Sequence, residues 1–360
     1  MKILFYINKI SDGGAERVIV NLANSFSNIG YEAVMVTSLK TEKEYPLNEK
    51  VKRLVLLQNA KKHGFIRKNI KLTSSLRKAV KEEKPDIVIS FMAEPNFRAI
   101  VSTLGMKTKT LISVRNDPNK EYPSKVYRFL ARHLYKKADG IVFQTEDAKA
   151  WFSDTIQKKS EIIANDVNPV FFETEYIGGK DIVTLGRLCE QKNHKLLINA
   201  YKKIADKHPD VNLRIYGAGP LEEELKGFIS EMELSDRVFL MGKTMDSQKV
   251  LSTAKCFVLS SDYEGMPNAL LEALVVGVPS ISTDCPCGGP RALIDNGKNG
   301  ILVPINDVDA ISEALDKLIS DVAFAKKLSE NAKESSERFK PDIVFGNWKK
   351  FVENIVSEVE

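Results

Sequence analysis

The chain has 360 residues, long enough for two domains or slightly more, and its 43% hydrophobic and 28% charged content is typical of a soluble globular protein. Four cysteines in a chain of this length exclude a disulfide framework, and Cys285-Pro286-Cys287 lacks the spacing of zinc ligands. No run approaches the ~20 apolar residues of a membrane span, and the apolar run that opens the chain is too short for a signal peptide. We therefore expect a cytoplasmic protein.

Charge is distributed unevenly between the two halves. Residues 1–170 contain 30 Lys and Arg against 18 Asp and Glu, and the remainder contains 23 against 30, so the net charges are +12 and −7. The basic excess concentrates in residues 61–84, where Phe65, Ile66, Ile70 and Leu72 lie between Lys and Arg residues. Such a segment can bind an anionic membrane surface, and a solvated helix and loop is the alternative. No recognised nucleic-acid module accompanies it, so we expect no nucleic-acid partner.

The first half of the chain alternates short apolar runs with amphipathic stretches. Strands are predicted at residues 2–7, 32–38, 51–57, 87–90, 110–114 and 141–143, and helices at 18–26, 72–83, 96–104 and 125–137. This alternation is typical of an α/β domain with a doubly wound parallel sheet.

Two turns of this half carry candidate ligand-binding residues. Gly13 and Gly14 lie between the first strand and the first helix, where glycine lets a ligand approach the backbone closely, although a tight turn alone would also explain them. Arg115 follows the strand at 110–114. It is either a ligand for a phosphate or carboxylate of a substrate, or a structural ion-pair residue.

The pattern changes near residues 161–169, and the polar stretch 173–180 is interpreted as a linker. A second alternating series follows. Its strands are predicted at 182–185, 213–216, 238–240, 256–259, 280–282 and 301–303, and its last helices end near residues 319, 335 and 359.

The stretch from Ser260 to Ala273 organises this second series. It leads from an apolar strand through a polar turn and Pro267, which suits the first turn of a helix, into an apolar helix that ends at Gly277. Free N–H groups and the helix dipole make such a turn an anion site. Glu264 and Glu272 bracket it, and carboxylates beside a phosphate site suit the hydroxyl groups of a sugar. We infer a nucleotide-sugar site, with an ordinary amphipathic helix as the alternative.

The setting EGMPNALLEA, with Glu264 and Glu272 eight residues apart, resembles the signature of the retaining glycosyltransferases of family 4. The resemblance covers essentially the whole chain and implies the GT-B fold, in which two Rossmann-like domains face each other across a cleft. It implies an acceptor-side domain at residues 1–168, a domain for the nucleotide sugar at 169–341, and a C-terminal helix, 342–360, that crosses back to the first domain.

Arg187 and Lys192 follow the first strand of the second domain, at the edge where open α/β sheets bind ligands. An Arg can hold phosphate oxygens with two parallel hydrogen bonds, and a Lys adds a point charge. Placed there, cations stabilise a diphosphate that gains charge as it leaves. Gly186-Arg187-Leu188 followed by Lys192 resembles the diphosphate clamp of the family. Two solvated cations are the alternative.

The remaining site residues rest on the same resemblance. Those on the donor side lie in the first loop, in the turn Gly217-Ala218-Gly219-Pro220, after the next strand and at the start of the helix of the Glu pair: Gly14, Gly217, Lys243, Asn268, Ala269 and Leu271. Gly13, Glu16 and Arg115 are expected on the acceptor side, where the usual His of the family is missing. The loop 284–291 is expected over the sugar pocket, although many relatives have Glu at the position of Ala292.

The resemblance implies that a hexose or N-acetylhexosamine moves from a UDP-sugar to a saccharide acceptor, lipid-linked on polyprenyl diphosphate, with retention of anomeric configuration. Glu264 would hold sugar hydroxyls or stabilise the oxocarbenium charge, and Glu272 would hold the ribose. No cofactor is expected, and no metal, because the one Asp-x-Asp triplet, at 307–309, suits a helix cap. A UDP-N-acetylhexosamine epimerase of the same fold and a non-catalytic sugar-nucleotide-binding subunit are the alternatives.

Overall fold

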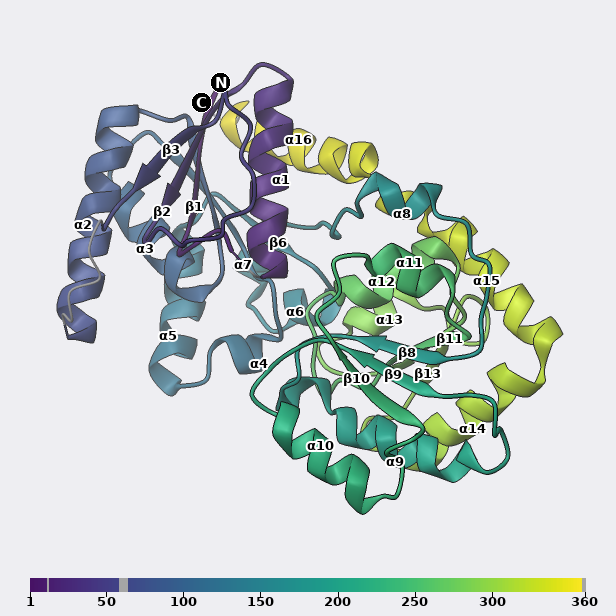
Figure 1. Ribbon diagram of the computed structural model, residues 1–360. Helices are drawn as coiled ribbons and strands as arrows, with labels where there is room; N and C mark the ends of the chain where they lie inside the picture. Colours follow the sequence, from purple (N-terminus) through teal and green to yellow (C-terminus); the bar gives the residue numbers. More distant parts are fainter. Residues whose placement is uncertain (12, 58–63, 358–360) are drawn as a thin grey trace. The chain divides into compact units, whose positions relative to one another are not determined.

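The computed structural model describes residues 1–11, 13–57 and 64–357 (Figure 1). The chain forms two compact units. The first comprises Met1–Asp166 together with the C-terminal segment from Asp342, and the second comprises Val167–Pro341. No helix among the described residues combines the length and the apolar character that crossing a bilayer requires.

The first unit contains a seven-stranded parallel sheet in the order β3-β2-β1-β4-β5-β6-β7. Its strands are β1 (Lys2–Ile7), β2 (Glu32–Thr37), β3 (Lys52–Val55), β4 (Ile87–Phe91), β5 (Lys109–Ser113), β6 (Gly140–Phe143) and β7 (Ser160–Ile162). The order reverses between β1 and β4, where neighbouring strands lead to helices on opposite faces. Open α/β sheets bind ligands at such a point, outside the carboxyl ends of the strands.

Alternate residues of these strands pack against helices on opposite faces of the sheet, because successive side chains of a strand point to opposite faces. Ile3, Phe5 and Ile7 of β1 pack with α1 (Gly14–Asn28) and α16 (Pro341–Ser357). Leu4 and Tyr6 pack with α2 (Phe65–Glu83) and α3 (Ala93–Thr103). The shorter helices of the unit are α4 (Pro118–Glu121), α5 (Lys125–Leu134), η1 (Tyr135–Lys137), α6 (Glu146–Ala150) and α7 (Asp154–Gln157).

The second unit contains a six-stranded parallel sheet in the order β10-β9-β8-β11-β12-β13, the arrangement of a Rossmann fold. Its strands are β8 (Ile182–Leu185), β9 (Leu213–Tyr216), β10 (Val238–Gly242), β11 (Cys256–Leu259), β12 (Ser280–Thr283) and β13 (Ile301–Val303). Its helices are α8 (Pro169–Glu173), η2 (Glu190–Lys192), α9 (His194–Ala205), α10 (Glu222–Glu231), α11 (Ser247–Ser252), α12 (Asn268–Val276), α13 (Gly289–Leu293), α14 (Val308–Ser320), α15 (Val322–Ser336) and η3 (Glu337–Phe339). The order reverses between β8 and β11, which are therefore the strands whose ends define the site.

The sequence predicts the α/β class, and the two Rossmann-like sheets confirm it. The expected cap at Asp307 is also confirmed, since its side chain accepts a hydrogen bond from the Ala310 N–H at 2.9 Å. One expectation is wrong in detail. The expected loop 284–291 ends in α13, which begins at Gly289, because a helix of five residues is too short to show a helical period. Helix α8 precedes the expected linker 173–180 and shares only Glu173 with it.

Candidate donor-sugar site

Glu264 lies in the turn after β11 and Lys192 in the turn after β8, the two neighbouring strands at the reversal point. The Lys192 Nζ lies 2.6 Å from Glu264 Oε1, and the Ser261 hydroxyl donates to the same oxygen at 2.7 Å. The two charged side chains are only 14% and 9% exposed. A buried carboxylate is costly without a charged partner, so the Lys192 ammonium offsets the cost of burying Glu264 at the mouth of the sheet.

Further hydrogen bonds join the two turns. Gln191 Nε2 donates to the Tyr263 carbonyl at 2.9 Å and lies 3.4 Å from Glu264 Oε2, while the Asp262 N–H donates to the Gln191 carbonyl at 2.9 Å. The Ser260 hydroxyl donates to the Lys192 carbonyl at 2.9 Å. Glu264 is thus held from both strands. Gln191 and Ser261 were not predicted, because a polar residue in a polar turn gives no sequence signal.

The turn that follows β12 fixes the Glu264 backbone. The Glu264 N–H donates to the Pro286 carbonyl at 2.7 Å, and the Cys287 N–H donates to the Glu264 carbonyl at 3.1 Å. Burial raises the pKa of the Cys285 thiol to about 12, so this thiol stays protonated and is no nucleophile at neutral pH. The expected loop beside the sugar pocket therefore contacts Glu264 directly.

Two glycines of the second unit allow close backbone approach. Gly217 has a φ of +153°, and a Cβ there would lie 1.7 Å from the Gly186 carbonyl oxygen. A Cβ on Gly289 would lie 1.7 Å from the Gly265 carbonyl oxygen. Any side chain at these positions would push apart the turns that carry Arg187 and Glu264. This packing reason stands beside the expected role of Gly217 in donor binding.

Arg187 is exposed, in contrast to Lys192. Its Nη2 lies 3.5 Å from Gln191 Oε1, and no carboxylate oxygen of the described residues lies within ion-pair distance. The Arg187 guanidinium is exposed and has no carboxylate partner in the part of the chain that the structure describes, so it can bind an external anion together with the Lys192 ammonium.

Helix α12 begins at Asn268, so Pro267 stands at the N-cap, one residue before the expected first turn. The Pro267 N-cap makes no side-chain cap hydrogen bond, and Asn268 and Ala269 are half-buried. The N–H of the buried Leu271 donates to the Pro267 carbonyl. Glu272 is buried one turn into the helix. The start of α12 therefore presents backbone N–H groups beside the turn of Glu264.

Lys243, the remaining residue of the second unit expected on the donor side, is exposed just after β10.

Two family models match the chain, each over nearly half of it. The model described as Glycosyl transferases group 1 matches residues 171–335, and the model described as Glycosyltransferase Family 4 matches residues 12–170. The chain therefore consists of two glycosyltransferase domains.

Relatives of this glycosyltransferase cover almost its whole length. An α-1,4-N-acetyl-D-galactosaminyltransferase of Campylobacter jejuni, whose name gives a diNAcBac-PP-undecaprenol glycan as its acceptor, is 29% identical over 99% of both chains. An uncharacterized glycosyltransferase of Methanocaldococcus jannaschii is 29% identical over 91% of both. The structures of sucrose-phosphate synthase from Thermosynechococcus elongatus (TM-score 0.86, 16% identity, 99% of both chains) and of Anabaena HepE with UDP and glucose (TM-score 0.82, 16% identity, 98% of this chain and all of that one) share the GT-B fold.

The residues expected on the acceptor side of the glycosyltransferase lie in the first unit, as does Gly14. Gly13 is the N-cap of α1, and Gly14 and Glu16 belong to its first turn. Arg115 follows β5. It donates to the Asn165 side chain and stacks over the Phe91 ring at 4.7 Å, and burial lowers its pKa to about 10. Its role in binding stays a prediction.

A buried arginine that the sequence did not single out lies at the reversal point of the first sheet. Arg98 Nη1 donates to Asn8 Oδ1 at 2.8 Å, and Nη2 donates to Glu94 Oε2 at 2.6 Å. Asn8 follows β1 and Glu94 follows β4, so Arg98 ties the two central strand ends together. A single Arg within a helical pattern gives no sign of this role.

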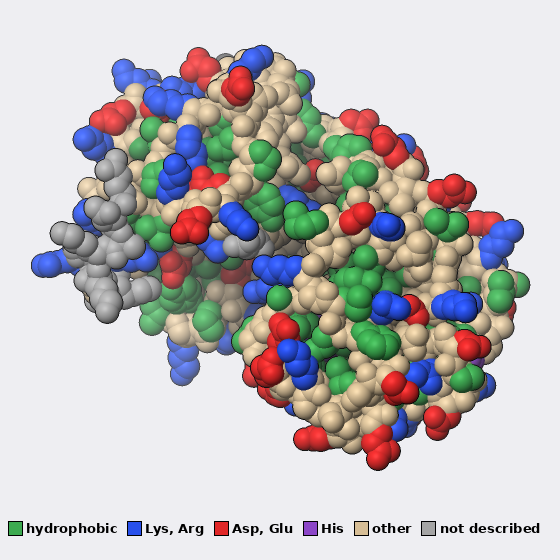
Figure 2. Space-filling model, in the orientation of Figure 1, with side chains coloured by type: hydrophobic (Ala, Val, Ile, Leu, Met, Phe, Trp, Pro, Cys, Tyr) green, Lys and Arg blue, Asp and Glu red, His purple; other side chains and the backbone are tan. Residues whose placement is uncertain are grey.

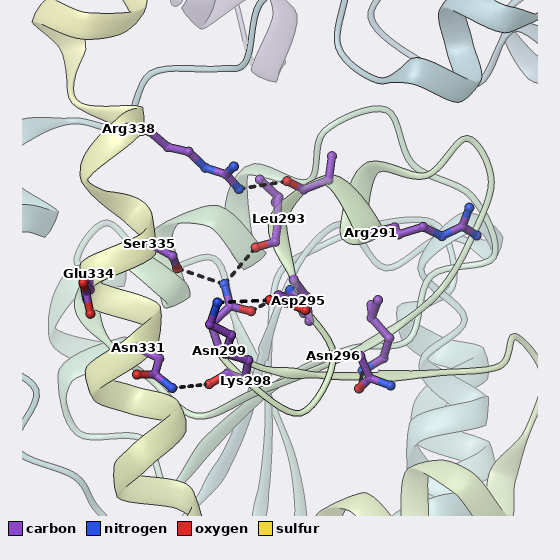
Figure 3. A pocket seen from close by; sticks show the side chains of 13 residues that line it. Arg291, Leu293, Asp295, Asn296, Lys298, Asn299, Asn331, Glu334, Ser335 and Arg338 are labelled. Carbon is purple, nitrogen blue, oxygen red and sulfur yellow. Dashed lines mark hydrogen bonds and ion pairs between the residues drawn. The ribbon is translucent and has the colours of Figure 1, made fainter.

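A cavity of about 810 Å³ lies in the second unit, between α13, the following loop and α15. Figure 3 shows the side chains that line it. Asn299 lines it and donates to the Leu293 carbonyl at 3.1 Å and to the Ser335 hydroxyl at 2.9 Å. Arg338, in η3 just after α15, donates to the Ala292 carbonyl at 3.0 Å. Arg291, at the end of the expected loop 284–291, lines this cavity, but none of the residues predicted to bind the donor or the acceptor does, so we do not assign it to the donor.

A buried histidine supports the turn of Arg187 and gives a pH prediction. The His194 Nε2 lies 3.2 Å from the Arg187 carbonyl, and burial lowers the pKa of the ring to about 4. The unfolded chain takes up this proton as pH falls below about 6.5, whereas the folded protein does not until about pH 4. The contribution of His194 to the free energy of unfolding is therefore fully present above pH 6.5, and it falls by about 3 kcal/mol as the pH drops from 6.5 to 4.

We expect His194→Gln to remove this loss. The free energy of unfolding would be measured with urea at several pH values from 7.5 to 4 for the wild type and the variant. The difference between the two proteins should change by about 3 kcal/mol across that range. A constant difference would contradict the assignment of a neutral buried ring.

Proposed function

We propose that the protein is a retaining glycosyltransferase that moves a hexose or N-acetylhexosamine from a UDP-sugar to a lipid-linked saccharide. The observation that carries this proposal is the buried Glu264–Lys192 pair at the reversal point of the second sheet. The pair places a carboxylate that can hold the sugar beside cations that can hold a diphosphate. This arrangement of charges is complementary to a nucleotide-sugar donor.

In this proposal the cations of the site bind the diphosphate, and its carboxylates bind the sugar and the ribose. Lys192 has three N–H donors and gives one to Glu264, so two can serve phosphate oxygens, together with Arg187. As the glycosidic bond breaks, the diphosphate gains negative charge, and these cations stabilise it. Glu264 holds the sugar hydroxyls or stabilises the positive charge that develops on the sugar ring. Glu272 binds the ribose, the amides that begin α12 assist the phosphates, and a leaving phosphate oxygen takes the proton of the acceptor.

The acceptor proposal rests on the relatives and on charge. The names of two Campylobacter jejuni relatives give acceptors linked through diphosphate to undecaprenol. The net charge of +12 in residues 1–170 suits an anionic membrane surface, and we place the enzyme at the cytoplasmic face of the membrane. Of the expected membrane segment 61–84, residues 61–63 and the side chains of Phe65 and Ile66 lie outside what the structure describes. Ile70 is exposed, but Leu72 is buried in the core of the unit and is no membrane anchor.

The direct test is a screen of nucleoside-diphosphate sugars, first by thermal shift and then by transfer. A donor at 100 times its dissociation constant should add about 2.7 kcal/mol to the free energy of unfolding. The stabilising donor is then incubated with polyprenyl-diphosphate glycans, and the anomeric configuration of the product is read by NMR. Conversion of the donor to an epimer without acceptor, or an inverted product, would overturn the proposal.

Arg187→Ala is expected to lower kcat by roughly 100-fold without loss of stability, because the exposed guanidinium stabilises charge only in the transition state. Steady-state rates and urea unfolding would be measured together. Lys202→Ala, which removes an exposed cation of α9 in the same unit, is the control and should keep wild-type rates. Equal rates for both variants would remove Arg187 from the diphosphate clamp.

EDTA is expected to leave turnover unchanged, because we assign the charge of the diphosphate to side chains and backbone N–H groups. No group of three or more His, Cys, Asp or Glu suited to a metal occurs among the described residues. Rates would be compared before and after dialysis against EDTA and after addition of Mn²⁺ or Mg²⁺. Activity that disappears with EDTA and returns with either ion would contradict the metal-free mechanism.

A further inference from the structure

Helix α5 exposes large apolar side chains on one side. Among the described residues of the first unit, the three most exposed large hydrophobic side chains are Val126 (65%), Ile70 (64%) and Phe129 (59%). Val126 and Phe129 are three residues apart and so lie on the same side of α5. His133 extends this line, with its ring stacked on that of Phe129 at a centroid distance of 4.1 Å. In Figure 2 hydrophobic side chains gather at the place that α5 has in Figure 1.

Basic side chains border this apolar line, and the helix carries no acidic residue. Residues 125–137 include no Asp or Glu, and their exposed basic residues are Lys125, Arg128, Arg132, Lys136 and Lys137. Two of them are held in place beside the helix. Arg128 Nε donates to the Tyr122 carbonyl at 3.0 Å, and the Arg132 guanidinium lies over the Trp151 ring at 4.6 Å.

The position of α5 within the first unit relates it to the proposed acceptor. Helix α3 packs against both α2 and α5, so the three helices form one layer. α2 and α5 both start on the carboxyl side of the sheet, following β3 and β5, which is the edge where open α/β sheets bind ligands. The exposed Ile70 of α2 and the apolar line of α5 therefore belong to the same layer of the fold.

The occupant that fits this surface is a lipid bilayer with anionic headgroups. Two or three apolar side chains make too small an area for a stable protein interface, which buries on the order of 1,200–2,000 Å². A bilayer needs only a few apolar anchors when basic residues stand beside them. We propose that α5 is a membrane-contact element of this protein, with Val126 and Phe129 inserted among the headgroups and the bordering Lys and Arg on anionic lipid. This inference rests on the proposed function, and it assigns a contact outside segment 61–84.

The test is co-sedimentation of the full chain with phosphatidylglycerol-containing and with pure phosphatidylcholine vesicles, at low and high salt. Val126→Ser/Phe129→Ser should lower the affinity for the anionic vesicles by about tenfold or more. Lys125→Gln and Lys136→Gln should each lower it about fivefold. The matched control removes exposed apolar groups of the second unit, in Val322→Ser/Met245→Ser, where the side chains are 67% and 99% exposed. It should bind like the wild type.

A fluorescence measurement locates the contact. In a Trp151→Phe background, Phe129→Trp leaves Trp348, which is buried in the core, as the only other tryptophan. Brominated lipids should quench the new tryptophan in bound protein. Bound protein without quenching, wild-type binding by the double Ser variant, or equal binding of the wild type to neutral vesicles would overturn the proposal.

Transfer to a short-chain, detergent-free acceptor separates this proposal from the proposed function. The Val126→Ser/Phe129→Ser variant should transfer sugar to such an acceptor at the wild-type rate while it fails to bind vesicles. Loss of this transfer in the variant alone would place the two residues in acceptor binding and overturn the lipid assignment. No transfer by the wild type with any donor would count against the proposed function instead, whatever the vesicles show.

Discussion

Glu264→Gln is expected to lower kcat by about 100-fold or more while the dissociation constant of UDP stays close to the wild-type value. The amide keeps the shape of the side chain and an oxygen that can accept from Ser261 and Lys192, which now lie 2.7 and 2.6 Å from Glu264 Oε1. What it removes is the fixed negative charge beside the sugar, and such charge stabilisation is worth roughly 10²–10³ in rate. The measurements are steady-state transfer rates and calorimetric titration with UDP.

The matched control is Glu190→Gln, which removes an exposed carboxylate in the turn of Lys192 and should keep wild-type turnover. If Glu264→Gln keeps its turnover but no longer binds UDP, the proposed roles of Glu264 and Glu272 are exchanged. Wild-type values for both quantities would remove Glu264 from the reaction.

The strands of both sheets could be predicted because they are buried on both faces. A parallel strand covered by helices on both sides is a short continuous apolar run, such as Ile182–Leu185 or Cys256–Leu259, and these two agree with β8 and β11 at both ends. Helix ends were less predictable. α1 begins at Gly14, four residues before the first apolar position of its pattern, because its first turn is polar.

The residue types of the site could be predicted, but their contacts could not. Glu264 and Lys192 were each singled out from their own turn, yet they are 72 residues apart, and only the strand order that places β8 beside β11 joins them. From the sequence, two separate charges are predicted, one for the sugar and one for the diphosphate. The structure combines them in one ion pair, supported by Gln191 and Ser261.

The first unit was less predictable than the second. Its candidate residues come from a glycine turn and a single arginine, and such features have simple structural explanations. Arg115 is largely enclosed by Asn165 and Phe91, while Arg98 links Asn8 to Glu94 without any motif around it.

Lys192→Ala is expected to lower kcat by about 100-fold and also to lower the free energy of unfolding by about 3 kcal/mol. The first effect arises because the ammonium stabilises the departing diphosphate. The second arises because the variant leaves the Glu264 carboxylate buried without its cation. Removing one partner of a buried ion pair is strongly destabilising. In this respect Lys192 should differ from the exposed Arg187, whose loss affects the rate alone.

The double variant Lys192→Ala/Glu264→Gln distinguishes the two effects. Removing both charges leaves no buried ion unpaired, so most of the lost stability should return while the rate stays low. Lys195→Ala is the surface control. Lys195 also forms an ion pair, at 2.5 Å from Glu224, but both side chains are exposed, so its loss should cost less than about 1 kcal/mol and leave the rate unchanged. Because Glu264→Gln alone is expected to lower kcat by about 100-fold, recovery of the rate together with the stability in the double variant would mean that neither charge takes part in the reaction, and the diphosphate clamp would reduce to Arg187 and the amides of α12.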